Sequence, residues 1–179
     1  TLAVNISGRW FHDPALIDTL TTALADHGIQ PHHLHVELTE TSILADSAWT
    51  ARQTKALRDL GIDVAIDDFG AGQTSLSYLH RFSIDTMKID REFTAHVIDD
   101  DSVSRLVGGM IRLFDTMDIE VVAEGIETAD QYQHLGSLGA HTGQGYYIAR
   151  PAPAPDITTW LDQRRRCAHA RPSRQGSEG

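Results

Sequence analysis

The chain has 179 residues, 41% of them hydrophobic and 22% charged, which is the composition of one globular domain with a sizeable core. The formal net charge is −10, and residues 1–163 hold ten of the basic and 24 of the acidic residues, so binding to duplex nucleic acid is disfavoured. No apolar run approaches the roughly 20 residues of a membrane span, and the single cysteine, Cys167, excludes an internal disulfide and a cysteine-based metal site.

Predicted strands and helices alternate along the chain. The strands are predicted at residues 2–6, 34–38, 64–67, 84–90, 119–124 and 142–148. The helices are predicted at about 14–28, 47–60, 75–80, 102–117, 128–138 and 156–165. Strands recur at spacings of roughly 20–35 residues, which is typical of right-handed βαβ units and a parallel sheet.

Three of these helices carry apolar faces. The helix at about 14–28 places on one face Leu16, Ile17, Leu20 and Leu24. The helix at 47–60 places on one side Trp49, Ala56, Leu57 and Leu60. The longest helix, which we expect Asp101 and Ser102 to cap, carries at a period of 3.6 the residues Val103, Leu106, Val107, Met110, Phe114 and Met117. These faces are predicted to pack on the sheet.

Polar residues fall at or near the end of every predicted strand. They are Asn5, Glu37, Asp67, Lys88, Glu124 and Gln144. Positions two residues earlier are mostly small or polar, whereas the alternate positions are apolar and would face the covering helices. A ring of polar groups at the strand ends favours a (β/α) barrel with its site at the C-terminal mouth. A doubly wound sheet also binds ligands at strand ends, but usually at one switch point.

The stretch VAIDDFGAG at 64–72 reads as a buried strand that delivers two carboxylates to a turn. Successive side chains of a strand point to opposite faces, so Asp67 and Asp68 serve one site only if the strand ends there and the glycines bend the backbone. The alternative is an acidic turn in which an Asp caps the next helix.

Several of these side chains have the chemistry of a metal site. Asn5, Glu37, Asp67 and Asp68 supply oxygen ligands that suit Mg²⁺, Mn²⁺ or Ca²⁺, and they suffice for two ions. Two such ions favour phosphoryl chemistry, for which Lys88 adds a positive charge and Glu124 a candidate general base.

Each of these residues also has a structural interpretation. Lys88 could pair with Asp90 at a barrel rim, and Glu124 could be a salt-bridge partner. Glu40 could bond the turn after Asp67 or cap a helix. The histidines at 32, 33 and 35 resemble a metal cluster, but surface histidines are favoured because a strand would place His33 and His35 opposite His32.

Six motifs together resemble the EAL-domain phosphodiesterases that open cyclic di-GMP. They are, in the order of that family, VNIS at 4–7, ELTET at 37–41, DDFG at 67–70, KID at 88–90, AEGIET at 123–128 and QGY at 144–146. The resemblance runs from Leu2 to about Pro151. It implies a modified TIM barrel, two Mg²⁺ or Mn²⁺ ions, and linear pGpG as the product.

The resemblance also implies roles for individual residues. Metals would be held by Asn5, Glu37, Asp67 and Asp68. Lys88 would orient water or phosphate, and Glu124 would act as the base. Substrate-lining or supporting residues would be Glu40, Asp90, Glu127 and Gln144. The rival interpretations are a non-catalytic cyclic di-GMP receptor or scaffold, an inactive fragment, and a metal-dependent barrel isomerase or lyase, which does not explain the motif order.

Two departures from the family pattern shape the expectations. Gln73 stands where the family usually has an aromatic residue, which bears on loop packing or dimer communication. The Glu-Ala-Leu signature is absent, so we expect about six βα units of an incomplete barrel, without its first two strands and one metal ligand. The chain also starts without Met, directly on a predicted strand, which suggests a segment of a longer protein.

The domain organisation expected from the sequence is simple. Residues 1–165 form the EAL-type domain, and 166–179 form a disordered Arg-rich tail. The resemblance adds an upstream diguanylate-cyclase-like or sensory domain and a possible homodimer. The start has no signal-peptide pattern, so the cytoplasm is the expected location, with any membrane anchor in upstream segments.

Overall fold

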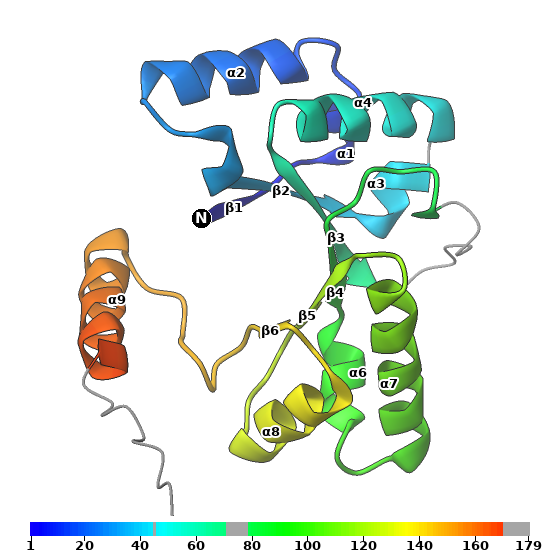
Figure 1. Cartoon of the computed structure of the whole chain (residues 1–179), viewed down its shortest axis with the longest axis vertical. Coiled ribbons are helices and arrows are strands. Elements are labelled where there is room, and N and C mark those ends of the chain that lie inside the picture. The colour runs from blue at the N-terminus through cyan, green and yellow to red at the C-terminus, as the bar shows by residue number, and fades with distance from the viewer. Residues whose placement is uncertain (45, 71–78, 170–179) are drawn as a thin grey trace, which may run out of the picture. The chain divides into compact units, whose positions relative to one another are not determined.

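The computed structural model describes residues 1–44, 46–70 and 79–169, with side chains up to residue 165 (Figure 1). The chain divides into two compact units, Thr1–Ile148 and Ala149–Gly179. The first contains the sheet and most helices, and the second contains helix α9 (Ala154–His169). This helix includes residues 166–169, which the sequence analysis assigned to the tail. None of the helices described is long and apolar enough to cross a membrane.

The first unit is built on six parallel strands in sequential order, as the sequence predicts. Their bounds are β1 Leu2–Asn5, β2 Leu34–Thr39, β3 Asp63–Phe69, β4 Thr86–Ile89, β5 Glu120–Ala123 and β6 Thr142–Gly143. Each strand pairs with the next in the chain, so β1 and β6 form the two edges of the sheet in the described part of the chain. This arrangement is an α/β, TIM-like half-barrel (Figure 1).

Helices connect the strands, as parallel pairing requires. Their bounds in the first unit are α1 Gly8–Phe11, α2 Leu16–Asp26, α3 Glu40–Leu44, α4 Ser47–Asp59, α6 Arg91–His96, α7 Asp101–Asp115 and α8 Ala129–Leu138, with the 3₁₀ turn η1 at Pro31–His33. The short helices α1, α3 and α6 were not predicted. The predicted helix at 75–80 lies almost entirely outside the described residues, as does Gln73.

The core lies between the sheet and these helices. Strand positions predicted to face the helices are fully buried at Val36, Ile66, Met87 and Ala123. Burying a side chain of the size of Val36, Ile66 or Met87 stabilises a fold by about 1.5–3 kcal/mol. The opposite face of the same strands ends in the polar residues predicted from the sequence. One face of the sheet therefore packs against the helices, and the other carries the candidate site.

The apolar face predicted for α4 is only part of its buried face. Leu57 is fully buried, and Trp49 and Leu60 pack on the core, but polar residues are buried beside them. The fully buried threonines of α4 are Thr50 and Thr54, whereas Trp49 is half-buried. The Thr50 hydroxyl donates to the Ile43 carbonyl at 2.8 Å, and the Thr54 hydroxyl donates to the Thr50 carbonyl at 2.9 Å. Since these bonds satisfy the hydroxyl groups, the helix can bury a face that periodicity alone reads as polar.

Two further details differ from the predictions. Helix α7 is capped by Asp100, which accepts from the Ser102 and Val103 amides, and Leu106 is 50% exposed.

Strand β6 ends at Gly143, five residues early, because the Ile126 amide donates to the Gln144 carbonyl at 3.0 Å and the following residues turn there. This turn brings Gln144 to the loop that follows β5.

Candidate active site

Lys88 lies at the centre of the polar ring. It is 4% exposed near the end of β4, between β3 and β5. Its Nζ atom lies 3.1 Å from Glu37 Oε1, 3.0 Å from Asp67 Oδ1 and 2.8 Å from Glu124 Oε1. Residues far apart in sequence therefore meet at one cation, and Lys88 does not pair with Asp90 as the structural interpretation supposed.

The surroundings of Lys88 keep it charged. Burial alone would lower the pKa of its ammonium group, but hydrogen bonds to Glu124, Asp67 and Glu37 outweigh that effect and raise the pKa above its ordinary value. Three carboxylates contact one ammonium group, and the charge of Asp68 also acts on this site, so negative charge is in excess. Divalent cations offset such an excess.

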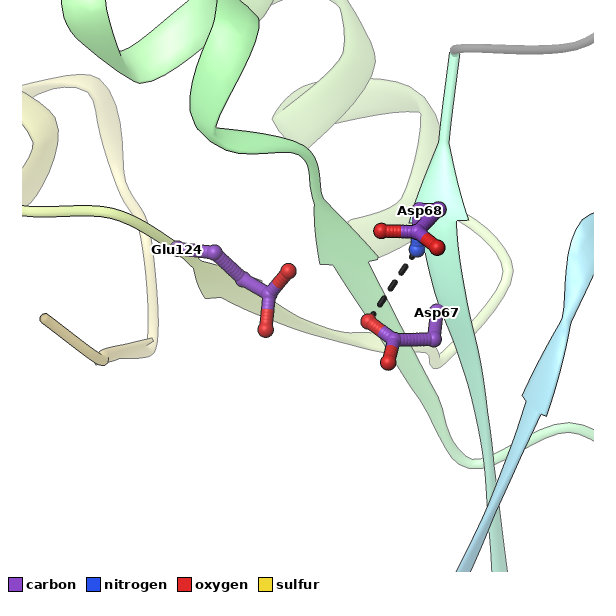
Figure 2. Close-up of side chains that lie close together, drawn as sticks. All are labelled: Asp67, Asp68 and Glu124. Carbon is purple, nitrogen blue, oxygen red and sulfur yellow. Dashed lines mark hydrogen bonds between the residues drawn. The ribbon is translucent and has the colours of Figure 1, made fainter. Parts of the chain in front are cut away.

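Asp67 and Asp68 reach one site by a different device from the one predicted. Strand β3 does not end at Asp67 but runs to Phe69, and its pairing with β4 shifts register between Ile66 and Phe69. Asp68 takes a left-handed backbone conformation at φ 56°, and its amide donates to Asp67 Oδ1 at 3.1 Å (Figure 2). This irregularity in β3 lets two consecutive carboxylates lie near each other.

Asp67, Asp68 and Glu124 form a compact carboxylate cluster (Figure 2). One oxygen of each lies within 4.8 Å of the others. Burial raises the pKa of Glu124; Lys88 lowers it, while the charges of Asp67 and Glu37 raise it further. Partial desolvation raises the pKa of Asp68 although the residue is exposed, and the charges of Asp67 and Asp90 raise it further. A cation among these oxygens would remove the repulsion, so the donor set fits a hard divalent ion.

Asn5 joins the ring from β1. Its Nδ2 donates to Glu37 Oε2 at 3.1 Å, while the other oxygen of Glu37 faces Lys88. Asn5, Glu37 and Asp67 are supplied by the consecutive strands β1, β2 and β3. The structure thus brings the four predicted metal ligands and Glu124 together around Lys88, the other predicted catalytic residue.

Glu40 supports the turn after Asp68. It is 4% exposed, and its Oε2 accepts a hydrogen bond from the Gly70 amide at 3.3 Å. Glu40 is also the first residue of α3. The prediction that Glu40 bonds this turn is confirmed.

The other three predicted residues line one cavity of about 280 Å³ beside the carboxylate cluster. Its lining includes Asp90, Glu127 and Gln144, together with Asp68 and Glu124. Asp90 also caps α6, where its Oδ1 accepts from the Glu92 amide at 2.7 Å. The cavity therefore adjoins the site.

Sequence reasoning missed Arg91, which contributes to the same cavity. Arg91 follows the KID motif directly, so its position was the available signal. Among the residues that line the cavity it carries the positive charge, while Asp68, Asp90, Glu124 and Glu127 are acids. An anionic ligand in this cavity would meet that charge.

The three histidines are not members of the group of side chains that, among the described residues, is placed to hold a metal ion. Residues 31–33 form η1 rather than a strand, so the alternation predicted for His32 and His33 was wrong. His35 lies in β2 and pairs with Asp63 at 3.3 Å. In the described residues, the cluster of Asp67, Asp68 and Glu124 is the only group of three or more His, Cys, Asp or Glu side chains that is placed to hold a metal ion.

The chain matches one protein family over most of its length. The family described as "EAL domain" matches residues 1–151. The bifunctional diguanylate cyclase/cyclic di-GMP phosphodiesterase MucR of Pseudomonas aeruginosa is 35% identical over 156 residues, which are 87% of this chain and 23% of MucR. The chain thus spans about a quarter of the length of such curated relatives.

Solved structures agree with this match. The structure of the MucR phosphodiesterase in complex with c-di-GMP has a TM-score of 0.82 at 35% identity, covering 87% of this chain and 63% of that one. The EAL domain of Mycobacterium smegmatis DcpA has a TM-score of 0.87 at 28% identity, covering 91% and 73%. The Klebsiella pneumoniae BlrP1 calcium/cyclic-di-GMP complex has a TM-score of 0.79 at 35% identity, covering 85% and 39%. The chain belongs to the EAL domain family.

Proposed function

We propose that the chain carries the active site of a phosphodiesterase that hydrolyses cyclic di-GMP to linear pGpG with Mg²⁺ or Mn²⁺. One observation carries the proposal: buried Lys88 contacts Glu37, Asp67 and Glu124 at the ends of parallel strands. Relatives add support, because MucR is named a cyclic di-GMP phosphodiesterase and BlrP1 was solved with cyclic di-GMP and manganese.

The ring would hold two metal ions. Asn5, Glu37 and Asp67 offer one set of oxygens, and Asp67, Asp68 and Glu124 offer the other. When bound, the ions supply positive charge to the phosphate and make a water easier to deprotonate. Asp67 would be shared, which gives it the largest part in metal affinity.

The residues of the chain then divide the remaining work. Water adds to one phosphorus atom, the bond from phosphorus to a ribose oxygen breaks, and that oxygen receives a proton. Glu124, whose pKa burial raises, is suited to accept the proton of the water. Lys88 holds its charge beside Glu124 and Asp67 and offsets charge that develops on the phosphate.

The adjoining cavity is proposed to bind the rest of the nucleotide. Asp90, Glu127 and Gln144 line it, and Arg91 offers a cationic contact to a base or phosphate oxygen. A nucleotide that occupies the cavity leaves one phosphate at the carboxylate cluster, because Asp68 and Glu124 belong to both.

We also propose that a signalling domain accompanies this one. MucR is named as a bifunctional cyclase and phosphodiesterase, and another relative, 31% identical, is the oxygen sensor protein DosP of Escherichia coli. Each of these proteins is much longer than the part that this chain matches. A homodimer remains a prediction from the sequence.

The test is to incubate the natural polypeptide that carries this sequence with cyclic di-GMP and Mg²⁺ or Mn²⁺ and to follow pGpG by chromatography. We expect pGpG to form in the presence of either ion and no pGpG to form after EDTA treatment. Tight binding of cyclic di-GMP without turnover would instead identify a receptor. Turnover that resists EDTA would contradict the metal-dependent mechanism.

A further inference from the structure

Two glycine turns follow the carboxylates of the site. Gly70 lies two residues after Asp68 at φ 104°, and Gly125 directly follows Glu124 at φ 65°. Backbone conformations of this kind are open to glycine and strained for other residues. Each glycine thus lies directly beside a carboxylate-bearing strand end, where a side chain would be strained.

The first turn of α6 packs against both glycines. The ring of Phe93 lies so close to Gly70 that a Cβ atom there would collide with it, with Phe93 Cζ only 2.9 Å away. At Gly125 a Cβ atom would collide with Arg91 and come within 3.1 Å of its Cα. Both contacts are therefore contacts of glycine backbone, without a side chain between.

Gly70 is held from two sides. The Glu40 carboxylate accepts the hydrogen bond of its amide, and the Phe93 ring covers its Cα. Phe93 is itself half-buried and packs on the hydrophobic core, so its ring is anchored. A ring fixed in this way limits the movement of Gly70 on the side that faces α6, although Gly70 is otherwise exposed.

We infer that Phe93 is a positioning residue, which fixes the Gly70 turn and thereby the place of Asp68 relative to Glu124. The inference rests on the proposed function, because it concerns the metal-holding carboxylates. Phe93 touches neither ion nor substrate in this account. It acts through the backbone of β3, where Asp68 is already in a strained left-handed conformation.

The test compares Phe93→Ala with the control Met110→Ala. Met110 also packs partly on the core but lies on α7, so its loss removes packing without touching the Gly70 turn. Mn²⁺ affinity by calorimetry is expected to fall about tenfold or more in Phe93→Ala, the range for residues that orient metal ligands, and to stay unchanged in Met110→Ala.

A second measurement uses the metal-free protein. Hydrogen exchange of the Gly70 amide is expected to be faster in Phe93→Ala than in Met110→Ala at equal thermal stability, because the hydrogen bond to Glu40 opens more often. If Phe93→Ala does not fold, Phe93→Leu takes its place, with a smaller loss of affinity.

The outcomes separate this inference from the proposed function. Wild-type protein that binds no Mn²⁺ would reject the metal site itself. Wild-type protein that binds Mn²⁺, together with Phe93 variants that match it in affinity and in Gly70 exchange, would overturn the positioning role alone.

Discussion

Lys88 and Glu124 each interact with several charged side chains of the site. Lys88 satisfies three carboxylates, and Glu124 both contacts Lys88 and belongs to the cluster with Asp67 and Asp68. From the sequence, Glu124 was predicted to be the base, with a salt bridge as the structural alternative, because a motif shows residue types but not the distances between them. Its position in the cluster supports a second role as metal ligand.

Glu124→Gln tests the two roles. Loss of the base is expected to lower kcat by on the order of 10²-fold or more, and loss of a charged ligand is expected to weaken Mn²⁺ binding as well. Steady-state kinetics and calorimetry measure the two effects. Unchanged metal affinity would leave Glu124 with the base role, and near-normal turnover would remove that role.

Lys88→Met tests the charge balance. Removing the ammonium leaves Glu37, Asp67 and Glu124 without their cation, and loss of one partner of a buried pair costs about 3–5 kcal/mol; the lower end applies because the carboxylates retain some exposure. We expect a lower Tm without metal and a larger rise in Tm on adding Mn²⁺ than in the wild type. Equal shifts in both proteins would show that Lys88 does not balance these acids.

At the scale of elements, β3 shows what an irregular strand contributes. A regular strand would send Asp67 and Asp68 to opposite faces, and the shift of register with φ 56° at Asp68 avoids this. The metal-free protein then holds an ionised Asp68 beside Asp67 and Asp90, at a cost in stability. That cost is small because Asp68 is exposed.

Asp68→Asn tests this cost. The pKa of Asp68 is raised in the folded protein, so the stability that its protonated form contributes is present at low pH and lost as pH rises through that pKa. Without metal, the variant is therefore expected to be more stable than the wild type at neutral pH, by a few degrees in Tm at most, with the difference vanishing below about pH 4. Thermal unfolding in EDTA across this range measures it, and a lower Tm for the variant at pH 7 would contradict the account.

The same elements show what sequence can predict. Strand order, the buried alternate positions and the six polar strand ends follow from periodicity and motif spacing. The irregularity in β3, the buried threonines of α4 and the early end of β6 depend on hydrogen bonds between distant segments, such as that from Ile126 to Gln144. Arg91 was missed because only the folded chain brings α6 beside Gly125.

At the scale of the molecule, the six-stranded sheet matters most. Among the described residues, β1 and β6 are its edges. Leu2 in β1 is 62% exposed, and Tyr146, shortly after β6, is 55% exposed. Edge strands present unpaired amide and carbonyl groups, and a closed barrel has none. The edges are thus the places where a further chain segment or another molecule would pair.

A polypeptide of residues 1–179 alone is expected to self-associate and to hydrolyse cyclic di-GMP negligibly. In the described part of the chain β1 and β6 each pair on one side only, and the resemblance implies one further metal ligand, in a Glu-Ala-Leu segment that these residues lack. Sedimentation measures the self-association of this polypeptide, and a pGpG assay compares its rate of hydrolysis with that of the natural polypeptide. A monomeric short chain with comparable activity would contradict this prediction.

The most direct measurement follows the rate of pGpG formation by the natural polypeptide as Mn²⁺ is raised, for the wild type and Asp67→Asn side by side. Asp67 contacts Lys88 and shares the carboxylate cluster, so its charge is central to holding the metal. We expect no product without a divalent ion and a wild-type rate that rises with Mn²⁺. The variant is expected to need at least about tenfold more Mn²⁺ to reach half of its lower maximum. The same Mn²⁺ dependence in both proteins, or product formed in EDTA, would contradict these expectations.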